Sequence, residues 1–406
     1  MGRLTLLDKV QMETLRYFTD FAHPESGMAR ERFGTPGMLD TVTTGGTGFG
    51  IMAMMAGVRR HFLGAEHAAA QITRICEFLL SAPRYRGAFA HWMNGNSGAT
   101  VSFSPQDDGG DIVETAFLVM GLITARQYLG GSAPRLTRLI DELWRGVDWA
   151  GYCPSPGAMM WHWSPRHGFG MGLELRGWHE ALVAFVLGAG SPTHSIDPRA
   201  YWLGWKNSPT YRNGQSYYRI YLPLGPAMGG PLFFSHYSFL GLDPRGLEDD
   251  GLSFFGQNRA QVRINRAHCM ANPHGFAGYG KDCWGLTSCD GPHGYEAFAP
   301  AHDKGVIAPT AALASMPYLP HAALAALSHF NRYQDGALWG DYGFRDAFCP
   351  QEGWVAESHL AINQGPIVAM IENHRSGLLW QLFMSAPEVR AGLSRLGIRY
   401  HGWRAA

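Results

Sequence analysis

Residues 106–123 read QDDGGDIVETAFLVMGLI. From Ile112 onward this segment is apolar on nearly every face of a helix, and such a helix must be enclosed by other elements. We therefore expect it to lie in the interior of the protein. Four further segments have the same all-round apolar character and are expected to be enclosed too: 50–57, 181–189, 306–316 and 366–371.

Between the enclosed segments lie stretches with a single apolar stripe. In the first of them, apolar side chains recur every three or four residues from Leu7 to Phe21, which is the spacing of one helix face. The same spacing occurs in 65–80 and 133–148, whose other faces carry charged residues. The alternation predicts an all-α, double-layered α/α toroid in which inner helices wall a central funnel and outer helices cover them.

The connections between these helices are long and rich in glycine, proline and aromatic residues. Long loops in a compact protein are usually functional, and alternate loops between antiparallel helices fall on one rim. We expect short β pieces on this rim, for example 88–92 with 100–103, and 161–163. No change in composition marks a boundary, so we expect a single domain over 1–406.

The charge balance argues against a nucleic-acid partner. The chain has 33 basic and 33 acidic residues, whereas nucleic-acid binding needs concentrated cations. No segment reaches the roughly 18 uninterrupted apolar residues of a membrane span, so we expect no membrane contact. The first 22 residues lack the apolar core of an export signal. The chain as written is expected in the cytoplasm, or in the periplasm if a leader was removed.

The sequence gives no sign of a metal or a cofactor. The six cysteines form no C-x-x-C pair and have no clustered histidine partner, which favours free thiols over a disulfide or a zinc site. The glycine-rich segment 44–50 follows no strand and precedes no lysine, so it is not a nucleotide-binding loop. We interpret its glycines as close packing at the start of an inner helix.

Carboxylates are densest just before the helix that begins near Ile112. Asp107, Asp108 and Asp111 are followed by Glu114, and Asp111 and Glu114 share one face of the first turn. A single acid here is explained by N-capping, which the helix dipole favours. Because clustered carboxylates repel one another, this number of acids favours a role in function.

Glu180 lies in the sequence RGWHE at 176–180, at the start of another enclosed helix. The residues after it are apolar, and burial favours the neutral form of a carboxyl, which suits a general acid. The alternative is an ordinary first-turn glutamate paired with Arg176 or His179.

Asp341 and Asp346 lie in an aromatic loop, WGDYGFRDAF at 339–348. Carboxylates among aromatic rings suit a sugar site, because rings stack on sugar faces and acids bind hydroxyls. The alternative for Asp346 is an ion pair with Arg345.

Histidines and aromatic residues crowd the same loops. Any one histidine is more often structural than a ligand, and the loop around Trp284 is as easily structural as functional. Together with the acids, these side chains suggest a funnel that binds carbohydrate, and glycosidic hydrolysis needs one protonated and one ionised carboxyl. The candidates for substrate contact are His91, Trp92, Trp161, His162, Trp284 and Asp341.

Longer motifs recur along the chain: GGTGFG at 45–50, DDGGDIVETA at 107–116, WHWSP at 161–165, SPTH at 191–194, GPLFFSHYSFLG at 230–241, CWGLT at 283–287, DGP at 290–292 and NQGPI at 363–367. Together these motifs resemble the bacterial endo-β-1,2-glucanase family of glycoside hydrolases, also called glucoamylase-like. The resemblance runs from about residue 12 to about residue 385. Tyr237 lies within one of these motifs and joins the candidates for substrate contact.

The resemblance implies an (α/α)6 barrel that hydrolyses β-1,2-glucan with inversion and without a metal. It assigns Glu180 as proton donor, Asp346 as the base, and Asp107, Asp111 and Glu114 as subsite acids. In relatives the base reaches its water through a substrate hydroxyl. The implied ligands are linear or cyclic β-1,2-glucan and its oligosaccharides.

The function expected from these features is an inverting, endo-acting β-1,2-glucanase. An exo-acting enzyme that releases sophorose or glucose, and a retaining transglycosylase, share the same fold. From another class, a non-catalytic glucan-binding protein would use the aromatic rim alone. A polysaccharide lyase also fits an α/α toroid.

Overall fold

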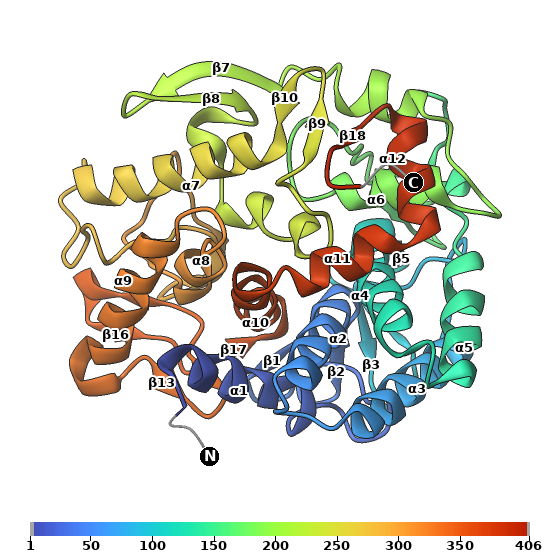
Figure 1. Cartoon of the computed structure of the whole chain (residues 1–406), viewed down its shortest axis with the longest axis horizontal. Helices are drawn as coiled ribbons and strands as arrows, with labels where there is room; N and C mark the ends of the chain where they lie inside the picture. The colour runs from blue at the N-terminus through green and yellow to red at the C-terminus, as the bar shows by residue number, and fades with distance from the viewer. Residues whose placement is uncertain (1–3, 404–406) are drawn as a thin grey trace.

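The computed structural model describes residues 4–403, and its helices form two layers (Figure 1). The inner helices are buried over most of their length, as their all-round apolar sequences predict. Neighbouring inner helices pack in the ring order α8, α10, α2, α4 and α6. Their bounds are α2 (Thr44–Arg59), α4 (Ile112–Leu129), α6 (Leu182–Gly190), α8 (Pro309–Leu313) and α10 (Ala361–Arg375).

Amphipathic helices form the outer layer and surround the inner ring in Figure 1. The predicted outer segments correspond to α1, α3 and α5. The end of the chain supplies α12, which packs on α6, and α1 packs on α2 and α10. The helix bounds are α1 (Leu6–Thr19), α3 (Ala65–Ser81), α5 (Pro134–Arg145), α7 (Phe254–Ala271), α9 (Pro320–Arg332), α11 (Leu378–Ser385) and α12 (Pro387–Leu396).

The gap in the ring between α6 and α8 is filled by two 3-10 helices, Leu232–Ser235 and Ser238–Leu240. The Val183 amide of α6 donates to Ser238 Oγ (2.9 Å), and His236 Nε2 lies 3.0 Å from Ser315 Oγ beyond α8. These turns occupy the sixth inner position and complete the (α/α)6 barrel. Other short helical turns are Ala150–Tyr152, Ala200–Trp205, Ala227–Gly229, Tyr333–Gly336 and Pro350–Glu352.

Short antiparallel strands decorate the loops, as expected. The predicted pairing of 88–92 with 100–103 is found in shifted form, since the strand β3 that pairs with β4 begins only at Trp92, and 161–163 contributes β6, which pairs with β5. The paired sets are β1 (Arg32–Phe33) with β17 (His359–Leu360); β2 (Thr41–Thr43), β3 (Trp92–Asn94) and β4 (Thr100–Val101); β5 (Gly110–Asp111) with β6 (His162–Trp163); β7 (Arg212–Tyr217) with β8 (Ile220–Leu224); β9 (Leu247–Asp249), β10 (Leu252–Ser253) and β18 (Arg399–Tyr400); β11 (Ser288–Gly291) with β12 (Gly294–Ala297); β13 (Trp339–Gly340) with β14 (Gly343–Phe344); and β15 (Phe348–Cys349) with β16 (Trp354–Val355).

Two glycines bring α2 and α4 into backbone contact. A Cβ on Gly48 would lie 2.2 Å from the carbonyl oxygen of Phe117, and one on Gly121 would lie 2.2 Å from the carbonyl oxygen of Gly48. Neither position has room for a side chain. The interpretation of the 44–50 glycines as close packing of an inner helix is therefore confirmed at Gly48.

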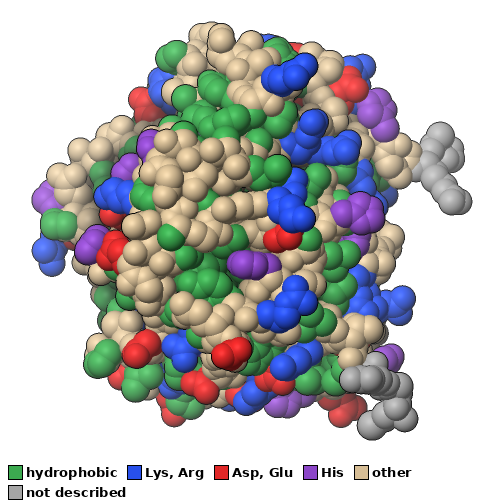
Figure 2. All heavy atoms as spheres, turned by 90° about the vertical axis from the view of Figure 1, so that its left-hand side faces the viewer, with side chains coloured by type: hydrophobic (Ala, Val, Ile, Leu, Met, Phe, Trp, Pro, Cys, Tyr) green, Lys and Arg blue, Asp and Glu red, His purple; other side chains and the backbone are tan. Residues whose placement is uncertain are grey.

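The apolar helix α4 is long and apolar enough to cross a membrane by length and composition, but 83% of it is buried inside the protein, where a core helix belongs. On the side of the molecule that carries α9, Figure 2 shows basic and acidic side chains spread among polar and apolar ones. All six cysteines are free thiols.

Candidate active site

A cavity of about 350 Å³ opens where the inner helices begin. Thr43 immediately precedes α2, Glu114 lies in the first turn of α4, Glu180 precedes α6, and Ile362 lies in the first turn of α10. Helix N-termini carry partial positive charge, which favours carboxylates there. Aromatic rings form much of the wall: Trp92, Phe103, Phe117, Trp161, Phe233, Tyr237 and Tyr295.

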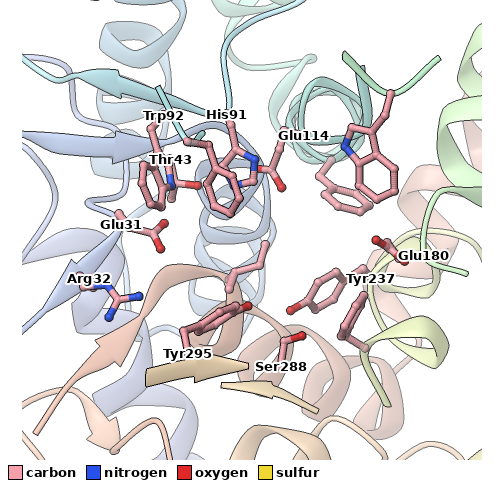
Figure 3. Close-up of a pocket in the computed structure, with 15 residues that line it drawn as sticks. Glu31, Arg32, Thr43, His91, Trp92, Glu114, Glu180, Tyr237, Ser288 and Tyr295 are labelled. Atoms are coloured by element: carbon pink, nitrogen blue, oxygen red, sulfur yellow. The ribbon is translucent and has the colours of Figure 1, made fainter. Parts of the chain in front are cut away.

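Glu180 projects into the cavity from the side opposite Glu31 and Arg32 (Figure 3). Its Oε2 lies 3.3 Å from His179 Nδ1 and makes no hydrogen bond within the described chain. The alternative pairing with Arg176 does not occur, because Arg176 binds Glu174 instead. Glu180 therefore presents a buried carboxyl oxygen that is available to a ligand.

Glu114 lines the same cavity and is held by the start of α2. The Gly45 amide donates to Glu114 Oε2 at 2.7 Å, and a Cβ on Gly45 would lie only 2.5 Å from that oxygen. Burial raises the pKa of the Glu114 carboxyl to about 7, although His91 opposes the shift. The carboxyl therefore changes charge near neutral pH.

Asp111 lies behind the wall and is fully buried. Its Oδ1 accepts from the amides of Val113 and Glu114, both at 2.9 Å, so it does cap α4. Its Oδ2 lies 3.1 Å from Trp161 Nε1 and 3.3 Å from His91 Nδ1. The N-capping interpretation thus holds for Asp111, and the same carboxylate also orients two residues of the cavity wall.

His162 bridges the two aspartates of this cluster. Its Nε2 lies 3.1 Å from Asp107 Oδ2 and 3.4 Å from Asp111 Oδ2. Burial opposes the charged imidazole, but the bonds to Asp107 and Asp111 outweigh it and raise the pKa of His162 to about 10. For Asp111, burial favours the neutral form, yet the bonds from His162 and His91 hold the pKa of its carboxyl well below the usual range.

His91, Asp107 and Asp111 each place one potential ligand atom within 4.8 Å of the others, the spacing of a metal site. Burial opposes the charge on His91, but Glu114 and Asp111 raise the pKa of its imidazole to about 9. The arrangement therefore fits a cluster in which imidazolium cations balance carboxylates.

Asp346 lies just behind the wall formed by Tyr237, Ser288 and Tyr295, and it is 3% exposed. Its Oδ1 accepts from Asn363 Nδ2, which also donates to the Ser288 carbonyl. Burial and the neighbouring Asp290 raise the pKa of Asp346 to about 7. Arg345 donates to the Ala356 carbonyl at 3.2 Å, and no ion pair joins it to Asp346 among residues 4–403.

The family model named Glycoamylase, described as "putative glucoamylase", matches residues 172–387. The chain belongs to this family of glycoside hydrolases. A solved structure of a Bacteroides uniformis protein with the same description is 47% identical and has a TM-score of 0.96 over 99% of both chains.

Two further relatives of this glycoamylase-family chain are named for β-1,2-glucans. The endo-β-1,2-glucanase of Chitinophaga pinensis, solved with sophorotriose and glucose, is 42% identical, with a TM-score of 0.94 over 98% of this chain and 99% of that one. The exo β-1,2-glucooligosaccharide sophorohydrolase (non-reducing end) of Parabacteroides distasonis is 41% identical over 96% of this chain. The chain spans 57% of that relative's length.

The structure brings most of the residues predicted for the glycoamylase-family site together. His91, Trp92, Glu114, Trp161, Glu180 and Tyr237 line one cavity, and Asp107, Asp111, His162 and Asp346 lie directly behind its wall. Their common location fits the expectation of carboxyl groups distant in sequence around one hollow.

Two predicted residues of the glycoamylase-family chain lie elsewhere. Trp284 is fully buried in the core, because residues 283–287 run beneath the cavity wall, where the Leu232 amide donates to the Leu286 carbonyl. Asp341 is exposed at the turn between β13 and β14 and lines a separate hollow with Trp339 and Glu357. Neither side chain faces the cavity that Glu180 lines.

Sequence reasoning missed part of the cavity in this family member. Glu31 and Arg32 reach it from a segment between α1 and α2 that has no helical periodicity. Tyr295 reaches it from β12, just after the DGP motif. The concentration of charge in Arg30-Glu31-Arg32 was the available signal, since only 16% of the residues in the chain are charged.

Proposed function

We propose that the chain hydrolyses β-1,2-glucan at internal linkages with inversion of the anomeric centre. The observation that carries the proposal is the cavity itself, in which an unbonded carboxyl oxygen of Glu180 faces aromatic walls with a second buried carboxyl, Asp346, behind them. The similarity to an endo-β-1,2-glucanase over nearly the whole of both chains supports the substrate and the internal cleavage.

The proposed role of Glu180 is general acid. Its Oε2 accepts no hydrogen bond from residues 4–403, with His179 Nδ1 3.3 Å away, and it faces the cavity, where a glycosidic oxygen would lie. A proton passed from this oxygen to the leaving glycosidic oxygen would allow the bond to break. His179 stacks on Trp161 at 5.7 Å and holds the segment that carries Glu180.

The proposed role of Asp346 is general base. Both of its oxygens accept hydrogen bonds at 2.7 Å, from the Asp290 amide and from Asn363, and such bonds favour the ionised carboxylate. An inverting enzyme needs room for a water between base and sugar. The recessed position of Asp346 suits a base that reaches this water through a substrate hydroxyl, as the family resemblance implies.

The other acids are proposed to bind and orient the sugar. Glu114 lines the cavity and is proposed to accept a hydrogen bond from a hydroxyl. Asp107 and Asp111 are proposed to act through His162, His91 and Trp161, whose rings they hold. Tyr237 and Trp92 offer apolar ring faces in a cavity whose few polar groups would set orientation.

The test is hydrolysis of linear β-1,2-glucan by the wild type, Glu180→Gln and Asp346→Asn. Each variant keeps the shape of the side chain and removes its proton chemistry, so activity should fall by roughly 10²- to 10⁴-fold. Near-normal activity of either variant would reject that residue's role. No new reducing ends from the wild type, with glucan still bound, would favour a non-catalytic binding protein.

A second candidate is exo-acting release of sophorose, favoured by the 41% identity to the sophorohydrolase of Parabacteroides distasonis. The chain lengths of early products separate the two modes. Internal cleavage gives a ladder of oligosaccharides from linear glucan and opens cyclic glucan. Sophorose alone, with cyclic glucan untouched, would replace endo action by exo action.

A further inference from the structure

A charged pair at the cavity, Arg32 in its wall and Asp290 beside Arg32, has no role in the function proposed above. Arg32 Nη1 lies 3.1 and 3.2 Å from the two carboxylate oxygens of Asp290. Ser358 Oγ donates to Asp290 Oδ2 at 2.5 Å. Both side chains are largely buried, with 17% of Arg32 and 15% of Asp290 exposed, so the charges are only partly screened by solvent.

The pair connects to Asp346 through the backbone of β11. The Asp290 amide donates to Asp346 Oδ2 at 2.7 Å, and Asn363 Nδ2 donates to Oδ1 at 2.7 Å. Arg32 lies on β1, which pairs with β17 at Leu360, three residues before Asn363. The ion pair therefore links β1 to β11. Both donors to Asp346 lie close to this link, because the Asp290 amide belongs to β11 and Asn363 follows the strand that pairs with β1.

We propose that Arg32 and Asp290 are positioning residues for the Asp346 carboxyl, with Asp290 aiming a backbone N–H at it and Arg32 neutralising Asp290, so that Asp346 stays ionised during hydrolysis. The inference rests on the proposed function, since it assigns the pair a task through the proposed base.

The two charges act on Asp346 in opposite directions. After burial, Asp290 is the largest influence that raises the pKa of Asp346 to about 7, and Arg32 lowers it. The other titratable groups around Asp346 are uncharged near neutral pH, because burial raises the pKa of each above its usual value: Tyr17 of α1, Tyr237, Cys289 of β11 and Tyr295 of β12. Glu31, beside Arg32, faces the cavity.

Opposite influences predict opposite shifts of the acidic limb of kcat/KM, which reports the ionisation of the base in the free enzyme. In Asp290→Asn the repelling charge is gone and Arg32 remains, so the limb should move to lower pH. In Arg32→Gln the Asp290 charge is left uncompensated, so the limb should move to higher pH. Each shift should be about one pH unit or more, and the double variant should return toward the wild type.

The experiment measures kcat/KM against pH on linear β-1,2-glucan, with melting temperatures for every variant. Arg32→Lys retains the charge and should keep the limb near that of the wild type, even if kcat falls. Arg345→Gln is the matched control, because it removes a guanidinium next to Asp346 in sequence that binds the Ala356 carbonyl instead. The acidic limb of kcat/KM in Arg345→Gln should stay at the pH of the wild type.

A second readout does not depend on activity. The ¹³C shift of the Asp346 carboxyl, identified by its loss in Asp346→Asn, titrates with the group itself and should move in the same two directions. Shifts of the same sign, or lowered kcat with an unmoved limb in both variants, would overturn the proposal and leave the pair as a structural clamp. An inactive wild type would refute the proposed function, while the carboxyl titration would still decide the inference.

Discussion

Replacing Gly45 with alanine tests the link between the start of α2 and the carboxyl of Glu114. The added Cβ would lie 2.5 Å from Glu114 Oε2, whereas ordinary contacts begin near 3.4 Å. The carboxyl must therefore move by close to an ångström, and its 2.7 Å hydrogen bond from the Gly45 amide is lost. The change acts on one substrate-facing group and leaves the backbone trace of α2 in place.

The expected loss follows from that hydrogen bond. A bond to a charged group contributes about 1.5–3 kcal/mol, which corresponds to roughly a 10- to 150-fold loss of kcat/KM if Glu114 holds the sugar in the transition state. The assay is initial-rate hydrolysis of linear β-1,2-glucan together with thermal melting. Gly64→Ala is the matched control, because a Cβ on Gly64 meets nothing within 4 Å.

Two results would refute this reasoning. Wild-type kcat/KM in Gly45→Ala would mean that Glu114 does not need its present position. A loss of activity that merely tracks a large fall in melting temperature would mean that the glycine serves packing, as Gly48 does.

Three further outcomes are expected. Gly48→Ala places a Cβ 2.2 Å from the Phe117 carbonyl, so the free energy of unfolding in urea should fall by at least about 2 kcal/mol; an unchanged midpoint would contradict the α2–α4 contact. His162 has a folded pKa of about 10 against 6.5 for the free side chain, so its stabilisation is present below pH 6.5 and is lost as pH rises through 10. The fall in unfolding free energy over that range should therefore be smaller in His162→Gln, and an identical fall would show that His162 is not charged in the folded state. Trp161→Phe keeps an aromatic face but loses the 3.1 Å bond to Asp111, so KM should rise by about tenfold with little change in melting temperature; an unchanged KM would separate Trp161 from substrate binding.

The inner helices could be predicted because their signal is local. The segments that became α2, α4 and α10 are apolar on every face, and only an enclosed position satisfies such a sequence. Residues 232–240 escaped prediction because Ser235 and Ser238 lie in two 3-10 helices with His236 between them, and the two serines form hydrogen bonds with neighbouring segments. A polar inner element has no periodic apolar pattern.

The residues of the site also fall into those with a local sequence signal and those without one. Glu114 was predictable because Asp107, Asp108 and Asp111 precede it, which is more acids than N-capping needs, and Glu180 because the helix after it is wholly apolar. Glu31 and Arg32 were not, because their place in the cavity depends on the pairing of β1 with β17, more than 300 residues away. Trp284 and Asp341 both lie in glycine-containing loops, yet one side chain is enclosed and the other exposed. Whether each of these side chains is buried depends on tertiary packing.

The measurement that tests the central claim most directly is the anomeric form of the first product, followed by NMR during hydrolysis of linear β-1,2-glucan by the wild type and by Glu180→Gln. One acid and one base acting on opposite sides of the sugar predict that the α-anomer appears first in the wild type and that the signal disappears in the variant. A β-anomer formed first, or an undiminished rate in Glu180→Gln, would contradict the account.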